Sequence, residues 1–173
     1  FTNARTSPGA PDWVTEHEVT VGYLPDGTAI TGHSDLFHIS SGTVIDWKIV
    51  GERQLANYKT NGPSERYRRQ AHSYGGGFML DPQPWGTPKQ VAIYFLPRDR
   101  EFERGYLWAE PWDPHVWSET VARVNRLWTL LQREGTGCTD TMPCCDNRFC
   151  HWCRLAERSA QTGQSLWEDL PPL

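Results

Sequence analysis

Three consecutive segments with the residue alternation of β-strands lie between residues 13 and 50, and they constrain the fold most strongly. The first is WVTEHEVTVGYL (13–24), and the second, AITGHSDLFHI (29–39), follows the turn residues PDGT. The third, TVIDWKIV (43–50), is rich in β-branched residues and follows the short turn SSG. Because short turns join antiparallel neighbours, the sequence predicts an antiparallel β-meander.

The rest of the chain shows helical and strand patterns in turn. We expect residues 51–62 to form a polar connection. A helix should then be capped by Asn61 or Gly62 and end at the glycines 75–77.

Further along, the almost continuous apolar segment 90–97 predicts a strand that is covered on both faces, and 105–112 predicts another strand. Residues 113–134 then predict a long amphipathic helix. Its expected buried stripe is Trp117, Val121, Val124, Trp128 and Leu131.

Composition and charge narrow the class of protein. The chain has 173 residues, of which 38% are hydrophobic and 22% charged, as in a globular domain with a sizeable core. No apolar run reaches the roughly 18 residues of a membrane helix, so we expect no membrane partner. The net charge of −4 excludes a strongly basic nucleic-acid binder, but it leaves room for a local basic groove.

Two aspartates and a lysine interrupt the apolar pattern of the expected hairpin. A turn at Ser40 and Ser41 places Asp35 opposite Asp46, with Cβ atoms about 4.5–5.5 Å apart. Lys48 follows two residues later and projects from the same face. Two carboxylates this close require a proton or a cation, and Mg²⁺ typically binds one or two carboxylates together with phosphate oxygens.

These groups are the parts that metal-dependent phosphodiester hydrolysis needs. Lys48 can hold or deprotonate a water molecule, or stabilise developing negative charge. The alternative is a structural Asp46–Lys48 pair with Asp35 in an exposed turn.

Three short motifs in this order resemble a known family. GHSD (32–35), VIDWK (44–48) and QAHSY (70–74) are similar to the motifs of the PD-(D/E)XK nuclease superfamily, in its RecB-like or CRISPR-associated-type exonuclease branch. The resemblance covers roughly residues 14–100. It implies an α/β (α+β) fold, with a restriction-endonuclease-like mixed β-sheet flanked by helices.

The resemblance also implies a role for each motif residue. Asp35 and Asp46 would bind the catalytic Mg²⁺ or Mn²⁺, and the backbone carbonyl of Trp47 would complete that shell. Lys48 would position the attacking water.

Gln70 and Tyr74 would orient the DNA strand or the lysine, and their i, i+4 spacing places them on one helix face. Many members of this branch carry a further metal-binding histidine on a helix before the first strand. We expect that helix upstream of this fragment or on another chain, with His17 or Glu18 as substitutes.

All five cysteines lie close together near the C-terminus, which predicts a metal site in a reducing compartment. Cys150 and Cys153 form a Cys-x-x-Cys pair, and Cys138 with either Cys144 or Cys145 can complete four ligands. Zinc and a 4Fe-4S cluster both accept four thiolates.

RecB-like relatives often carry an iron–sulfur cluster bound by a Cys-x-x-Cys run with a further cysteine six residues on. Here Ser159 occupies that last position, which favours a structural Zn²⁺, with His151 as a possible substitute ligand. The expected organisation is a polar lead-in (1–13), a nuclease core (14–134) and a cysteine-rich, metal-bound C-terminal knob (135–173).

The sequence therefore predicts a metal-dependent deoxyribonuclease, in the first place an exonuclease, acting in DNA repair, recombination or phage DNA metabolism. The alternatives are a structure- or sequence-specific endonuclease on the same core, and a non-catalytic, metal-stapled DNA-binding subunit. Arg66 and Arg69 are the expected phosphate contacts, unless they form a solvated charged face. The expected partners are DNA and a fused or associated helicase or recombination protein, in the cytoplasm of a bacterium or of a phage-infected host.

Overall fold

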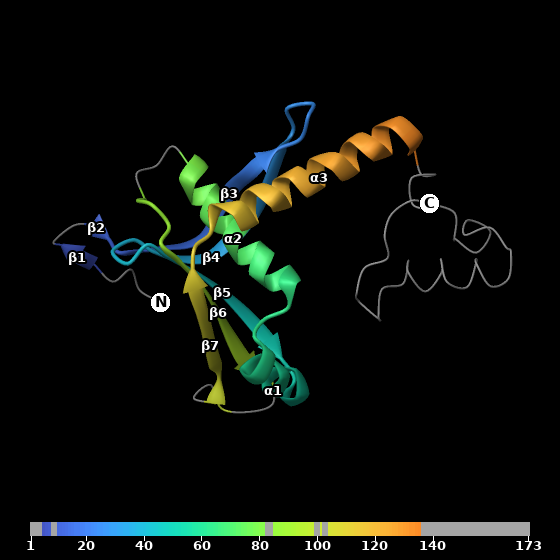
Figure 1. Cartoon of the computed structure of the whole chain (residues 1–173). Coiled ribbons are helices and arrows are strands. Elements are labelled where there is room, and N and C mark those ends of the chain that lie inside the picture. The colour runs from blue at the N-terminus through green and yellow to red at the C-terminus, as the bar shows by residue number, and fades with distance from the viewer. Residues whose placement is uncertain (1–4, 8–9, 82–84, 99–100, 102–103, 136–173) are drawn as a thin grey trace, which may run out of the picture. The chain divides into compact units, whose positions relative to one another are not determined.

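The computed structural model describes residues 5–7, 10–81, 85–98, 101 and 104–135 (Figure 1). The chain divides into two compact units, Phe1–Arg126 and Leu127–Leu173, and the first of them contains the whole sheet and the candidate site. The expected cysteine-rich knob falls outside the described residues.

Five strands form a mixed sheet in the order β3-β4-β5-β6-β7. β5 and β6 are parallel, and the other neighbours are antiparallel. The predicted meander is confirmed. The expectation that β6 is covered on both faces is only partly correct, because Val91, Ile93 and Phe95 are buried on one face whereas Tyr94 and Leu96 on the other face are only partly buried. The strand bounds are β3 Trp13–Tyr23, β4 Ala29–His38, β5 Thr43–Val50, β6 Gln90–Pro97 and β7 Tyr106–Pro111.

Two helices, α1 (Glu52–Asn61) and α2 (Glu65–Leu80), connect the parallel strands β5 and β6. The expectation of a polar connection over 51–62 was wrong, because Leu55 and Tyr58 bury one side of α1. The ring of Tyr58 stacks on Phe95 at 4.4 Å between centroids. The expected cap was also wrong, since Asn61 ends α1 and Ser64 is the residue that precedes α2.

Helix α2 continues through the three glycines that were expected to end it. A Cβ atom on Gly75 would lie 2.3 Å from the indole of Trp112, and one on Gly76 would lie 2.3 Å from the indole of Trp117. On Gly77 it would lie 2.6 Å from Val19. The glycines therefore let two tryptophans and a strand approach the helix backbone, and this packing offsets their low helix propensity.

Both α1 and α2 cover the same face of the sheet (Figure 1). Phe37 of β4 stacks on Phe78 of α2 at 4.3 Å, and Phe95 of β6 lies under Tyr58 of α1. Phe37 of β4 pairs with Val44 of β5, and Val44 pairs with Val91 of β6, so these three residues lie on the same face of the sheet. The protein thus has a mixed α+β fold, with a five-stranded mixed sheet flanked by helices.

Helix α3 (Pro114–Glu134) follows β7. Its expected buried stripe is only partly correct. Trp117 and Val121 are partly buried, whereas Val124 and Leu131 are exposed. Val116 is the one residue of α3 that counts as buried, with 9% of its surface exposed. None of the helices in the described part of the chain is long and apolar enough to cross a membrane.

The β4–β5 turn is tied to a residue of the expected lead-in. Asp12 is buried, and its carboxylate accepts hydrogen bonds from the backbone N–H and the hydroxyl of Ser40. Nε2 of His38 lies 2.7 Å from the other oxygen of Asp12. Two short strands before Asp12, β1 (Arg5–Ser7) and β2 (Ala10–Pro11), pair with each other. This end of the hairpin is therefore fixed by polar contacts as well as by the turn.

Candidate functional site

The hairpin register agrees with the one inferred from the turn. Leu36 pairs with Ile45 and Phe37 pairs with Val44, which makes Asp35 and Asp46 the next positions along the two strands. Both aspartates lie in regular strands, so Asp35 does not occupy an exposed turn. The negative charge of Asp35 acts on the carboxyl of Asp46, so the two side chains lie near each other.

Asp46 and Lys48 form the buried centre of the site. The side chain of Asp46 is 2% exposed and that of Lys48 is 18% exposed. Nζ of Lys48 lies 2.5 Å from Oδ2 of Asp46, although this oxygen makes no hydrogen bond of regular geometry with any described residue. Nζ also lies 5.3 Å from the ring centre of Tyr67, close enough for a cation–π contact. The ammonium of Lys48 therefore lies between the carboxylate of Asp46 and the ring of Tyr67 on α2.

Asp35 is fixed by the strand that it faces. Its Oδ2 accepts a hydrogen bond from the backbone N–H of Trp47 at 2.7 Å. The regular pairing of β4 with β5 ends at Leu36 and Ile45, so this carboxylate serves as the acceptor on β4 for the N–H of Trp47. Since the N–H and C=O of one strand residue point to the same edge, the carbonyl of Trp47 also points toward β4.

The electrostatics of Asp46 follow from its surroundings. Burial raises the pKa of its carboxyl above the ordinary value of 3.8, because the charged form loses its hydration. The nearby ammonium of Lys48 acts in the opposite direction and lowers this pKa, whereas the negative charge of Asp35 raises it further. A second cation at this position would stabilise both carboxylates as anions.

The residues fit a hard divalent ion such as Mg²⁺ or Mn²⁺. The carboxylates of Asp35 and Asp46 face one region, and Mg²⁺ commonly binds through one or two protein carboxylates with water completing its shell. Within the described residues, no three His, Cys, Asp or Glu side chains gather as a ready-made metal cage. The protein would therefore supply two carboxylates and, as expected for Trp47, a backbone carbonyl.

The two expected substitutes for an upstream histidine have other partners. His17 lies 2.6 Å from Asp81 through Nε2 and packs against the ring of Phe78. Glu18 lies 3.6 Å from His33 on the exposed surface. Neither residue is thus placed as a third ligand.

Gln70 and Tyr74 form one unit on α2. Nε2 of Gln70 donates a hydrogen bond of 2.8 Å to the hydroxyl of Tyr74. The Tyr74 ring packs over Gly32 of β4, where a Cβ atom would lie 2.9 Å from the ring. The glycine of the GHSD segment therefore provides the space that lets α2 approach the strand carrying Asp35.

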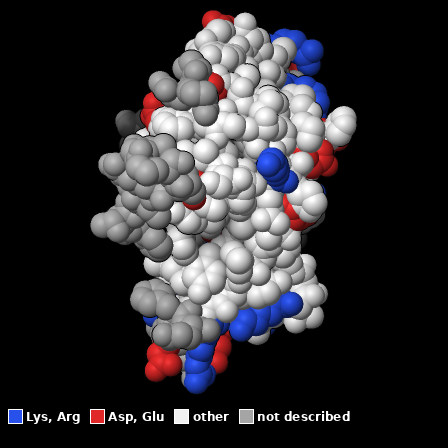
Figure 2. Space-filling view, turned by 90° about the vertical axis from the view of Figure 1, so that its left-hand side faces the viewer, with Lys and Arg blue, Asp and Glu red and all other residues white. Residues whose placement is uncertain are grey.

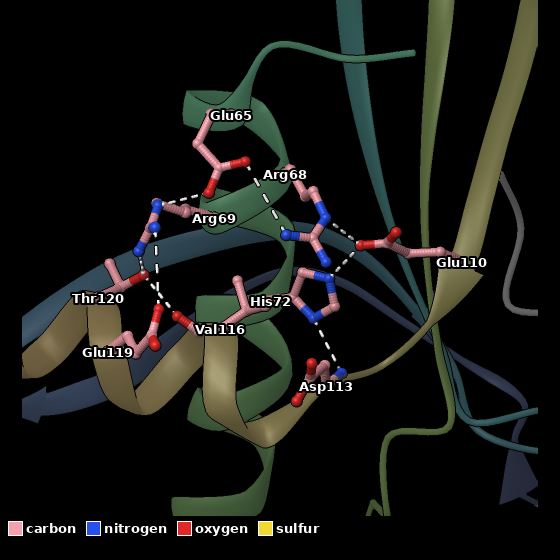
Figure 3. Close-up of polar contacts among 9 residues, drawn as sticks. All are labelled: Glu65, Arg68, Arg69, His72, Glu110, Asp113, Val116, Glu119 and Thr120. Carbon is pink, nitrogen blue, oxygen red and sulfur yellow. Dashed lines mark hydrogen bonds and ion pairs between the residues drawn. The ribbon is translucent and has the colours of Figure 1, made fainter. Parts of the chain in front are cut away.

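The expected DNA contacts at the start of α2 differ in their surroundings. Arg66 is exposed and has no ion pair with the described residues. Arg69, in contrast, pairs with Glu65 at 2.7 Å and donates a hydrogen bond of 3.3 Å to Thr120 (Figure 3). Arg66 is thus available to a phosphate, whereas Arg69 would have to leave partners within the chain.

Sequence reasoning missed a buried polar network behind the site, which Figure 3 shows between α2, β7 and the start of α3. His72 is 0% exposed, and its Nε2 lies 2.6 Å from Glu110. Its Nδ1 accepts a hydrogen bond from the backbone N–H of Asp113, so the ring proton lies on Nε2. Arg68 donates a second hydrogen bond to the same oxygen of Glu110. The i, i+4 spacing of Arg68 and His72 was the available signal.

Comparison with known proteins adds no assignment. No protein-family model matches the chain, and no curated protein matches its sequence. The expected thiolate ligands lie outside the described residues, and they stay a prediction from the sequence: Cys138, Cys144 or Cys145, Cys150 and Cys153.

Proposed function

We propose that this chain is a metal-dependent DNA nuclease of the PD-(D/E)XK superfamily with a restriction-endonuclease-like core, acting first as an exonuclease. The observation that supports this most directly is that the side chains of Asp35, Asp46 and Lys48 lie close together on the β4–β5 hairpin. A buried lysine beside two carboxylates is poorly explained by stability alone, because both charges lose hydration.

Each residue has a role that its contacts support. The N–H of Trp47 fixes one oxygen of Asp35, and Lys48 fixes the orientation of the Asp46 carboxylate. The bound Mg²⁺ or Mn²⁺ would polarise the phosphodiester and lower the pKa of a water molecule. The Lys48 ammonium donates to the attacking water or to the phosphoryl oxygens, where negative charge develops.

The Gln70–Tyr74 unit borders the same hairpin through Gly32. Its amide and hydroxyl can position either the DNA strand or the lysine, and Arg66 offers a phosphate contact one turn earlier on α2. With DNA as substrate, the protein would act in the cytoplasm of a bacterium or of a phage-infected host, alone or with a helicase or recombination protein.

Cleavage of labelled linear DNA and of covalently closed circles, each with Mg²⁺ or Mn²⁺, tests the proposal. We expect loss of linear DNA in wild type and a rate about 10²- to 10⁴-fold lower in Lys48→Ala, the usual range for a lost acid–base group. Asp26→Asn, in the exposed β3–β4 turn, is the control and should cut like wild type. Cutting of circles would instead identify an endonuclease.

Metal binding gives a second readout that does not depend on the rate. Mg²⁺ or Mn²⁺ should raise the melting temperature of wild type and of Asp26→Asn but not that of Asp46→Asn. An Asp46→Asn variant that cuts DNA at the wild-type rate would disprove the site assignment.

A further inference from the structure

A row of hydrogen bonds at the β4–β5 turn joins the side chains of Asp12, His38 and Ser41. Nδ1 of His38 lies 2.7 Å from Oγ of Ser41, and Nε2 of the same ring lies 2.7 Å from Oδ2 of Asp12. A serine within hydrogen-bond reach of a histidine that a carboxylate orients is the arrangement of nucleophilic catalysis. These residues are separate from the candidate site, since Thr43 at the start of β5 is three residues, about 10 Å of strand, before Asp46.

The hydrogen bonds of this cluster fit one placement of the protons. The hydroxyl of Ser40 donates to Asp12 and lowers the pKa of its carboxyl, and the bonds from His38 and from the Ser40 N–H lower it further, against the effect of burial. Because an ionised carboxylate only accepts, His38 donates from Nε2, and Nδ1 of the neutral ring accepts from the hydroxyl of Ser41. The hydroxyl of Thr43, 2.7 Å from Oγ of Ser41, then donates to that oxygen. Serine hydrolases commonly use Nε2 as the base, but either ring nitrogen can take a proton.

The base is held in place while the serine stays accessible. The side chain of Asp12 is 8% exposed and that of His38 is 25% exposed, whereas Ser41 lies on the surface. The indole of Trp13 stacks on the His38 ring, with 4.0 Å between centroids. Gly42, at a φ of 66°, closes the turn by donating its N–H to the carbonyl of His38 at 2.9 Å. The contacts of Asp12 are enough to fix the turn, and they do not require a surface serine on the second ring nitrogen.

Acyl transfer also needs a donor for the oxyanion that forms on the substrate. Within the part of the chain that the structure describes, the backbone N–H of Ser41 makes no hydrogen bond, so it can donate to that oxygen. The turn lies beside β1 and β2 on the left-hand side of Figure 1, and Figure 2 shows that side of the molecule. Much of the surface between its upper and lower ends is uncharged, which suits a neutral substrate better than a polyanion.

We propose that Ser41 is an activated nucleophile that takes the acyl group of a neutral carboxylic ester, an activity that does not depend on the proposed nuclease function. Oγ of Ser41 bonds to the carbonyl carbon, and its proton passes to Nδ1 of His38. The bond from that carbon to the alcohol oxygen then breaks, and His38 gives the proton to the leaving alcohol. Water attacks the acyl-serine with the same nitrogen as base, which releases the carboxylic acid and restores Ser41. Asp12 stabilises the imidazolium in both steps.

Labelling with a fluorophosphonate, which reacts with activated serines, tests the nucleophile directly. We expect peptide mass spectrometry to find the label on Ser41 in wild type, and Ser41→Ala to take up none. His38→Gln should react about 10²- to 10⁴-fold more slowly, the range for a lost general base. Ser118→Ala is the matched control and should label like wild type, because Ser118 is also exposed but donates to the backbone carbonyl of His115 rather than to a base.

Hydrolysis of p-nitrophenyl acetate tests the acyl transfer. Wild type and Ser118→Ala should release a burst of p-nitrophenolate equal to the amount of protein, followed by a slower steady rate. Ser41→Ala should lose the burst and keep the wild-type melting temperature, since the change is small and exposed. If His38→Gln fails to fold, Ser41→Ala decides alone.

EDTA separates this activity from the proposed metal-dependent one. The label and the burst should be the same in EDTA and in Mg²⁺, whereas DNA cleavage should be lost in EDTA. Absence of label on Ser41 in wild type, a burst that Ser41→Ala keeps, or a burst that EDTA removes would each overturn the proposal. A wild type that labels at Ser41 but never cleaves DNA would reject the nuclease function alone.

Discussion

Replacing Asp46 with asparagine should make the free energy of unfolding, relative to that of wild type, increase with pH, while it removes the proposed metal ligand. The Asp46 carboxyl is almost completely buried, and burial raises its pKa more than the ammonium of Lys48 lowers it. The folded state therefore holds the proton of Asp46 more tightly than the unfolded state does. Asparagine has nearly the same shape and stays neutral at every pH.

The sign and the size of the effect follow from proton linkage. A group whose pKa is raised on folding contributes most to stability below its unfolded pKa, near 3.8 for Asp46. That contribution falls as the pH rises, with a slope of up to about 1.36 kcal/mol per pH unit, and becomes constant above the folded pKa. The free energy of unfolding of Asp46→Asn minus that of wild type should therefore increase with pH from about pH 4 upward, by up to this slope.

Urea unfolding followed by tryptophan fluorescence, in EDTA over a pH series, measures both free energies of unfolding. Asp26→Asn is the control with the opposite sign. The Thr28 backbone N–H lowers the pKa of the Asp26 carboxyl, so the free energy of unfolding of wild type should increase relative to that of Asp26→Asn as the pH rises. If the free energy of unfolding of wild type also increases relative to that of Asp46→Asn with rising pH, the raised pKa of Asp46 is wrong.

Two further predictions concern α2. Gly76→Ala should lower the free energy of unfolding by about 1–3 kcal/mol, because its Cβ would lie 2.3 Å from Trp117. Gly51→Ala is the control and should cost less, since its Cβ would have no atom within 4 Å. Chemical denaturation measures both, and a Gly76→Ala protein more stable than wild type would contradict the close approach. Tyr74→Phe removes the hydroxyl that Gln70 contacts and should slow DNA cleavage without changing stabilisation by Mg²⁺, which a joint rate and melting measurement checks.

The sheet was predictable from the sequence, whereas parts of the helical layer were not. Alternating residues and short turns define the register, and this placed Asp35 and Asp46 on neighbouring positions. The side on which Lys48 lies follows from its i, i+2 spacing to Asp46. In α1 only Leu55 and Tyr58 carry the apolar signal, so a polar connection was the simpler interpretation.

The glycines of α2 show a limit that is set by contacts between distant residues. Three successive glycines normally favour the end of a helix. Their actual partners, Trp112 and Trp117, come more than 30 residues later, and local sequence does not show that these indoles lie on the helix backbone. The contacts of Arg69 with α3 are hidden for the same reason, because Thr120 and Glu119 lie about 50 residues later in the chain.

The two sides of α2 connect the buried network to the proposed chemistry. One side brings Tyr67 to Lys48 and Tyr74 to Gly32, next to the carboxylates. The other side places Arg68 and His72 on Glu110 of β7, and the His72 side chain is 0% exposed. A buried polar network holds one geometry only when its members are satisfied. The position of the lysine and tyrosine at the site therefore depends on hydrogen bonds made on the far side of the same helix.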